Sequence, residues 1–404
     1  MANVSSSNGL EKYPKLRFKG FSAPWNAIRF GDIVDEYSDR TKEENEDILL
    51  SAAIEGMFLN SELFDHQRGA STKGYKKIDM GTLVLSTQNL HLGNANVNLR
   101  FEHGMVSPAY KTYHIHDCSI GLIAEWVKSE KAKRFFYDAT TVGASVCRRN
   151  VEWDTLYDQP LYLPSDAEQE HLAAFLTALS TRIKKQTELV EHLKKYKRGL
   201  LNRYFPLNSG NSNLIPLLGL IKEIMDGDWI ESKDQSPRGI RLIQTGNVGV
   251  GEYIEKPESA KYISEETFER LHCTEIYSGD ILVSRLPSPA GRACIVPNTN
   301  ERMITAVDCT IIRCDETRCI SEYLTQFLNS PSYFKTVESF LAGGTRQRIS
   351  RKNLESILVP MVEMEEQKQI ADILTQFDKK ILHEISYLQG LQQCKKGLLQ
   401  ALFV

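Results

Sequence analysis

The chain has 404 residues, a length that suggests two or three domains. Its composition is 41% hydrophobic and 25% charged, which excludes wholesale disorder and collagen-like repeats. The formal net charge of -3 at pH 7 argues against a uniformly basic coat for nucleic acid, although a local basic groove remains compatible with it.

Residues 1–12 belong to a polar stretch, MANVSSSNGLEKYPK, which lacks the apolar core of a secretory signal and reads as a disordered tail. No run approaches about 18 consecutive apolar residues, so we expect no membrane span. The eight cysteines contain no CxxC pair. Free thiols in a reducing cytoplasm are therefore the better interpretation.

A β-rich globular part is expected over residues 13–160, because runs such as LVLS and YKTYHI alternate with Gly, Asn and Pro punctuation. Its loop RGASTKGYKK and its segment CRRN are basic, and each is suited to nucleic acid or is simply a solvated surface. The candidate DNA-binding residues here are Arg68, Lys73, Lys76, Lys77, Arg148 and Arg149.

A long helix is expected over residues 161–205, beginning just after Pro164. Its apolar positions follow the alternating four-three spacing of a heptad seam. The predicted seam positions are Leu172, Leu176, Leu179, Ile183, Gln186, Val190 and Leu193.

A second β-rich globular part is expected over residues 206–358. Its loops RLIQTGN, SRLPSPAGR and GGTRQRISRKN are polar and glycine-flanked. Arginine forks suit guanine edges and phosphates, whereas Gln and Asn suit adenine. The candidate DNA-binding residues are Arg241, Gln244, Thr245, Asn247, Ser284, Arg285, Arg292, Arg346, Gln347 and Arg348, with a solvated surface again as the alternative.

The last predicted helix, over residues 359–404, repeats the first one 198 residues later: EQEHLAAFLTALSTRI from Glu168 corresponds to EQKQIADILTQFDKKI from Glu366. GTLVLS from Gly81 and GDILVS from Gly279 share this offset, so the chain is two copies of one unit. The second seam comprises Ile370, Leu374, Phe377, Ile381, Glu384, Leu388 and Leu391.

We therefore predict an α+β fold with two mixed, β-rich globular domains joined by two long helices. The helices pair as an antiparallel coiled coil about a pseudo-two-fold axis, with Gln186 opposite Glu384. The alternative is two surface helices, each packed on its own domain.

Signatures of catalysis are missing from the sequence. It has no Walker A motif, no HExxH and no GxSxG, and GNVGVG has the wrong spacing for a dinucleotide loop. Cys309, Cys314 and Cys319 step by five residues, unlike zinc ligands, and YHIHDC reads as a strand. We expect no metal site and no catalytic residue in this chain.

The whole of residues 13–404 resembles the specificity (S) subunit of type I restriction–modification systems. The resemblance lies in YPKLRFKGFSAPW with FGDI, in DGDWIESKD, in IRLIQTGNVGVGEYIEK and SGDILVSR, and above all in GGTRQRISRKNLESILVPMVEMEEQKQIADIL. It implies that residues 13–160 and 206–358 are target-recognition domains and that 161–205 and 359–404 are the conserved helical regions.

The resemblance further implies that each domain reads one half of a bipartite site in double-stranded DNA and that the coiled coil sets the spacer. Two methyltransferase subunits would dock on the helices, and restriction motor-nuclease subunits would complete a phage-defence complex. S-adenosylmethionine, ATP and Mg would then belong to these partners, and this chain would hold no cofactor. The alternatives are an interaction scaffold with decayed recognition domains and a fused nuclease or methyltransferase.

Overall fold

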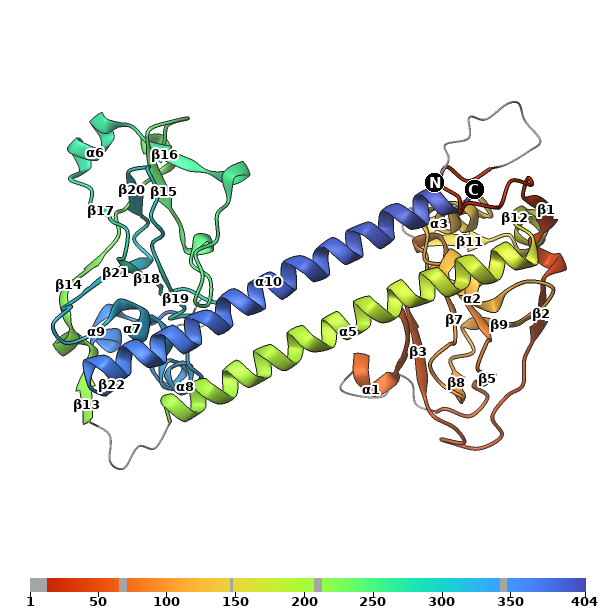
Figure 1. The fold of residues 1–404 in the computed structure, drawn as a ribbon, viewed down its shortest axis with the longest axis horizontal. Coiled ribbons are helices and arrows are strands. Elements are labelled where there is room, and N and C mark those ends of the chain that lie inside the picture. Colours follow the sequence, from red (N-terminus) through yellow and green to blue (C-terminus); the bar gives the residue numbers. More distant parts are fainter. Residues whose placement is uncertain (1–12, 65–70, 146–147, 207–212, 342–346) are drawn as a thin grey trace. The chain divides into compact units, whose positions relative to one another are not determined.

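The computed structural model describes residues 13–64, 71–145, 148–206, 213–341 and 347–404 (Figure 1). The chain forms two compact units. The first runs to Thr187 and includes Ser386–Val404, and the second is Glu188–Ile385. The predicted disordered tail, residues 1–12, lies outside the described residues.

The main sheet of the first unit has four antiparallel strands in the order β2-β9-β6-β7. These strands are β2 (Val34–Tyr37), β9 (Tyr110–Ile115), β6 (Leu83–Ser86) and β7 (Ala95–Val97). Four two-stranded sheets accompany it: β1 (Asn26–Arg29) with β12 (Pro160–Leu163), β3 (Leu50–Ala53) with β4 (Gly56–Leu59), β5 (Lys76–Asp79) with β8 (His103–Val106), and β10 (Thr140–Ser145) with β11 (Arg148–Val151). The short α-helices are α1 (Asn60–Leu63), α2 (Ile120–Trp126), α3 (Glu130–Asp138) and α4 (Trp153–Asp158).

The second unit contains a sheet of the same form, in the order β14-β21-β18-β19. These strands are β14 (Ile221–Asp226), β21 (Cys309–Cys314), β18 (Ile281–Ser284) and β19 (Ala293–Ile295). A second sheet has the order β16-β15-β20-β17, with β16 (Lys261–Ile263), β15 (Ile240–Ile243), β20 (Met303–Thr305) and β17 (Glu275–Ile276). The remaining elements are β13 (Asn213–Pro216) paired with β22 (Leu358–Met361), α6 (Glu265–Leu271), α7 (Ser321–Phe327), α8 (Pro331–Phe340) and α9 (Arg351–Glu355).

The shared strand order confirms the internal repeat at the level of the fold. The starts of β6 and β18, of β12 and β22, and of the two long helices are each separated by 198 residues. The start of α7 follows that of α2 by 201 residues, and two of the three extra residues lie between the end of β21 and the start of α7. The offset read from the sequence therefore holds only for part of each unit.

Serine caps fix the starts of the short helices that cover these sheets. The Ser119 side chain accepts the backbone N–H of Leu122 at the start of α2, and that of Ser129 accepts the N–H of Ala132 at the start of α3. In the second unit Ser330 caps α8 in the same way. These short helices then contribute apolar side chains to the core that each unit builds around its main sheet.

The two long helices are α5 (Asp166–Tyr204) and α10 (Met364–Leu402), and they lie inside the predicted ranges 161–205 and 359–404. In the first unit Leu172 near the start of α5 shares a hydrophobic core with Leu402 at the end of α10. In the second unit Leu201 near the end of α5 shares a core with Ile370 near the start of α10. The helices are thus antiparallel in each unit, as predicted. No helix in the described part of the chain is long and apolar enough to cross a membrane.

Candidate nucleic-acid interface

Most of the candidate DNA-binding residues of the second unit gather at one end of its sheets. Ser284 at the end of β18 pairs with Cys309 at the start of β21, and Asp226 at the end of β14 pairs with Thr310. The parallel strands β15 and β20 also end here, with Ile243 beside Thr305. We call this end the loop face; it comprises residues 226–228, 244–248, 285–292, 306–308 and 347–351.

Arg292 ties two of the loops on this face together. Its side chain is only 8% exposed, and all of its nitrogens donate to backbone carbonyls. The acceptors are Val248 O at 2.6 Å, Thr245 O at 2.7 Å, Leu286 O at 2.8 Å and Pro289 O at 2.9 Å. Because two acceptors lie in each loop, Arg292 positions the loops and uses four of its five donors to do so.

Several other candidate side chains are also buried and make hydrogen bonds within the second unit. Arg241 is 3% exposed and donates to Lys261 O, Lys256 O and the Glu255 carboxylate at 3.3–3.4 Å. Asn247 is buried, and its amide donates to Ile254 O. Direct base contacts by Arg241, Asn247, Arg292 and the fully buried Ser284 would require these arrangements to break.

Exposed side chains remain at the segment that precedes α9. Gln347 is exposed and lines a pocket of 410 Å³ together with the loop 287–290 and α8. Arg348 is 45% exposed and lies 3.3 Å from Asp308. Gln244 and Thr245 are half-buried on the same face, and Arg346 lies outside the described residues. Gln244, Thr245, Gln347 and Arg348 are thus the described candidates that the groove of a DNA duplex could contact without any rearrangement of the loops.

The basic residues of the first unit are less uniform than the sequence suggests. Lys73 is exposed, Lys77 pairs with Glu46, and Lys76 is 5% exposed, so burial lowers the pKa of its amine. Arg149 donates to Thr140 and stacks on Tyr137, which anchors the β10–β11 hairpin. Arg68 lies outside the described residues, as does the side chain of Arg148.

Two further basic residues lie next to a strand end or a helix start: Lys111 was not among the sequence candidates, whereas Arg351 belongs to the basic loop GGTRQRISRKN. Lys111 near the start of β9 pairs with Glu36 at 2.7 Å and lies 4.2 Å from the ring centre of Trp153. Arg351 at the start of α9 lies 3.7 Å from Asp226. For Lys111 the sequence signal is a basic residue next to a predicted strand end, and for Arg351 it is a basic residue next to a predicted helix start.

In each unit the two long helices and one short helix share a cluster of a lysine and a carboxylate. In the first, Lys395 of α10 lies 2.6 Å from Glu125 of α2, and Ser180 of α5 donates to the same carboxylate at 2.7 Å. In the second, Lys197 of α5 pairs with Asp378 of α10, to which Gln326 of α7 donates at 2.8 Å. Lys395 and Lys197 correspond in the repeat, whereas the carboxylate has moved from a domain helix to a long helix.

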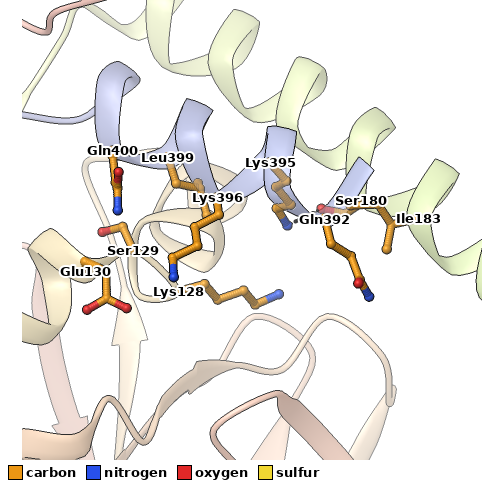
Figure 2. A pocket seen from close by; sticks show the side chains of 10 residues that line it. All are labelled: Lys128, Ser129, Glu130, Ser180, Ile183, Gln392, Lys395, Lys396, Leu399 and Gln400. Carbon is orange, nitrogen blue, oxygen red and sulfur yellow. Dashed lines mark hydrogen bonds between the residues drawn. The ribbon is translucent and has the colours of Figure 1, made fainter. Parts of the chain in front are cut away.

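A pocket of 460 Å³ in the first unit lies beside this cluster (Figure 2). Lys128, Lys395 and Lys396 line it, and Ile183 and Leu399 supply apolar surface. Figure 2 shows the Lys395 side chain turned toward Ser180, while the Lys396 side chain reaches down toward the α2–α3 junction. The polar lining of the pocket thus combines three lysines with one carboxylate, that of Glu130, and several neutral side chains.

The predicted seam positions all lie on the covered side of the two helices. Each of the fourteen is buried or half-buried, while most of the residues between them are exposed. Gln186 and Glu384 are 4% and 8% exposed, and their mutual pairing stays a prediction.

Some of the residues considered as metal ligands lie in strands, whereas His116, Cys118 and Cys319 lie outside them. Cys309 and Cys314 begin and end β21, and His114 on β9 stacks on Tyr37 with ring centres 4.0 Å apart. Within the described ranges, no group of three or more His, Cys, Asp or Glu residues is placed to hold a metal ion.

Comparison with known proteins gives consistent relatives. Residues 223–388 match the family model of the type I restriction modification DNA specificity domain. A curated relative, the type I restriction enzyme MjaVIII specificity subunit of Methanocaldococcus jannaschii, is 22% identical over 291 residues, which cover 68% of each chain.

Solved structures resemble the fold along nearly the whole chain. The type I restriction–modification S subunit from M. genitalium has a TM-score of 0.60 at 12% identity, covering 97% of this chain and 99% of its own. A chain from a structure on complex assembly and conformational transition of the type I R-M system has a TM-score of 0.55 at 15% identity, covering 94% and 97%. The family model thus covers most of the second unit, and the two solved structures share the fold of the chain.

Proposed function

We propose that this chain is the DNA sequence-specificity subunit of a type I restriction–modification complex. The observation that carries the proposal is the loop face of the second unit, which lies within the matched residues 223–388. The main sheet that contributes to this face has the same form as the main sheet of the first unit. Each unit then reads one half of a bipartite DNA site. Because the two sets of loops differ in sequence, the two halves need not be alike.

The long helices dock two methyltransferase subunits, and their length sets the unspecified spacer between the half-sites. The lysine-lined pocket of the first unit lies on these helices, which makes it a candidate contact for such a partner. Restriction motor-nuclease subunits complete the complex. S-adenosylmethionine, ATP and Mg are bound by these partners, which act on the host DNA in the cytoplasm, and this chain selects the position at which the adenine is flipped and methylated.

The test is to express the chain with its cognate methyltransferase subunit in a host without modified adenine and to map methyladenine by long-read sequencing. We expect one bipartite motif, which disappears when this chain is omitted. A complex that assembles but leaves the DNA unmethylated would favour the scaffold alternative.

A salt series on the purified complex separates the same alternatives in vitro. Groove binding through phosphates makes the logarithm of the affinity fall linearly with the logarithm of the salt concentration. A scaffold without a DNA-reading role should show weak DNA affinity at every salt concentration.

A further inference from the structure

The loop face of the second unit contains a cluster of two carboxylates and three guanidinium groups. Asp226 lies 3.4 Å from Arg285 and 3.7 Å from Arg351, and Asp308 lies 3.3 Å from Arg348. The members of this acid–base cluster come from four different segments of the chain, so the fold itself brings them together.

Both carboxylate oxygens of Asp226 contact neighbouring segments of the loop face and hold them together. Its Oδ1 accepts a hydrogen bond from the Thr310 hydroxyl at 2.9 Å, and its other oxygen faces Arg285 and Arg351. The next residue, Gly227, passes so close to the backbone of β20 that a Cβ there would lie 2.4 Å from the Ala306 carbonyl oxygen. Asp226 therefore has a structural task that accounts for its charge.

Arg285 is likewise used inside the cluster. Its side chain is 5% exposed, and its Nη2 donates to Val307 O at 2.5 Å. Burial lowers the pKa of this guanidinium, as do the positive charges of Arg348 and Arg351. Arg285 thus adds positive potential at the loop face while its Nη2 is used by a backbone carbonyl, and its buried Nε has no hydrogen-bond partner among the described residues.

Asp308 has no such task. Its side chain is 28% exposed, and in the described part of the chain its ion pair is with Arg348, which is itself 45% exposed. The Oδ1 atom of Asp308 is buried under this partner and makes no hydrogen bond of normal geometry to a described residue. An exposed ion pair of this kind contributes little to stability, so stability does not explain a carboxylate at this place.

A carboxylate at a DNA-reading surface is unfavourable opposite most sequences. It repels phosphates, and it places an acceptor against the acceptors of thymine and guanine in the major groove. It is favourable only where the groove presents an amino donor, namely N4 of cytosine or N6 of adenine. Such a residue adds specificity mainly by penalising the wrong sequences.

We propose that Asp308 is a specificity-determining residue of the second unit, whose carboxylate accepts a hydrogen bond from the exocyclic amino group of one base in the half-site. Arg348 beside it supplies the positive charge that lets the carboxylate approach the DNA. The inference rests on the proposed function of the chain, and it adds the chemistry that this unit requires of one base: an amino group in the major groove.

The experiment compares the wild-type complex with Asp308→Asn, in which an amide of the same shape both donates and accepts. Initial methylation rates are measured on duplexes that carry the mapped motif and on a panel with every single-base change. We expect discrimination to fall at one position of one half-site, where the motif has cytosine or adenine, and to stay unchanged in the other half-site. The wild-type base at that position distinguishes the two amino donors.

Binding to a random duplex gives a second readout. Removing the carboxylate should tighten this non-specific binding by about threefold, the scale of one exposed ion pair. In the background of Arg348→Gln, Asp308→Asn should have a smaller effect, because the two side chains act as a pair. Asp308→Ser, which is also neutral, guards against a folding defect peculiar to the amide.

The matched control is Glu265→Gln in the same unit. It also removes one negative charge next to an arginine, since Glu265 lies 2.7 Å from Arg302, which is outside the acid–base cluster. If Asp308→Asn behaves like this control, or weakens binding to every duplex alike, the inference is overturned. If the wild-type complex methylates no motif, the proposed function itself fails.

Discussion

At the scale of single residues, the second unit shows two different uses of arginine. Arg292 is surrounded by backbone carbonyls, whereas Arg348 is paired with a carboxylate near the surface. A guanidinium has five N–H donors in a rigid plane. When backbone carbonyls accept from most of these donors, the side chain holds the loops that carry those carbonyls in fixed positions. One that is half-exposed and singly paired can change its partner when DNA arrives.

Arg292→Lys is therefore expected to reduce the discrimination between DNA sequences without abolishing DNA binding. The lysine ammonium is a point donor and cannot reach all four carbonyls, so both loops should loosen; lost charge-assisted hydrogen bonds cost about 1.5–3 kcal/mol each when the acceptor stays buried. Hydrogen exchange of residues 245–248 and 286–290 should accelerate, and the ratio of cognate to random-DNA affinity should fall about tenfold. Arg302→Lys serves as the control, and unchanged exchange in both loops would contradict the role.

In the first unit, Glu44 organises the loop that contains Lys73. It accepts hydrogen bonds from the Ser71 hydroxyl and from the backbone N–H and hydroxyl of Thr72, which lower the pKa of Glu44 to about 2. Because this pKa is below the ordinary value of 4.5, the carboxylate stabilises the loop above that pH and ceases to do so as the pH falls toward 2.

The expected result is a pH-dependent protection of the Thr72 amide. Its protection factor against hydrogen exchange should be lower at about pH 3 than at about pH 5, since protonation removes the acceptor. Glu44→Gln should show low protection at both values. Equal protection of the wild-type amide at the two values would mean that Glu44 does not hold this loop.

At the scale of elements, the two repeats keep a lysine at the same position of the long helix, but the carboxylate that pairs with it comes from different elements. Lys395 and Lys197 occupy the same heptad position, yet the carboxylate is supplied by α2 in one unit and by α10 in the other. A lysine in an apolar seam is tolerated only with such a partner, because an unpaired buried charge is costly.

The two lysines should therefore differ in their contributions to stability. Glu125 is 6% exposed and Asp378 is 29% exposed. Removing Lys395 therefore leaves the more deeply buried of the two carboxylates without its partner. We expect Lys395→Met to destabilise the chain by about 3–5 kcal/mol and Lys197→Met by about 1 kcal/mol. Thermal midpoints of the two variants measure this order.

Adding Glu125→Gln to Lys395→Met should recover much of the lost stability, because the orphaned charge is then removed. If the double variant is no more stable than the single one, the loss comes from packing of the lysine stem rather than from charge.

How far the sequence predicts these elements depends on the range of the interactions involved. The heptad seam, including Leu172 and Ile370, is a local pattern of period 3.5 and is visible in a single helix. The partner of Lys395 is not visible in the same way. The three extra residues before α7 shift the repeat, and a carboxylate at Glu125 looks like any surface residue until the fold brings α2 to the helix.

The sequence predicts which loops form the candidate site better than it predicts which of their side chains are exposed. The loops 244–248 and 285–292 do converge at one end of the sheets, because strand order places them there. Arg241 and Arg292, however, are buried. Sequence does not distinguish an arginine that faces solvent from one that is held by backbone carbonyls, since both occur in polar, glycine-flanked loops. Asp308 shows the converse, a carboxylate that residue type alone would exclude from a DNA-binding surface.

At the scale of the whole molecule, each unit is built on both long helices, so neither unit contains a complete copy of the sequence repeat. The first unit uses the beginning of α5 and the end of α10, and the second uses the remainder of each. A matched change in the length of both long helices, made where the chain passes from one unit to the other, alters no core residue. It should therefore act on the relation between the two half-sites alone.

Matched insertions test this idea. One heptad placed after Thr187 in α5 and another after Ile385 in α10 preserve the side of each helix that bears the seam and lengthen each helix by about 10 Å. At about 3.4 Å per base pair, the methylated motif should keep both half-sites and gain about three base pairs of spacer. An insertion in α5 alone should instead reduce stability, because the two seams then lose their register. If the doubly extended chain methylates a motif with the original spacer, the helices do not set the distance between the half-sites.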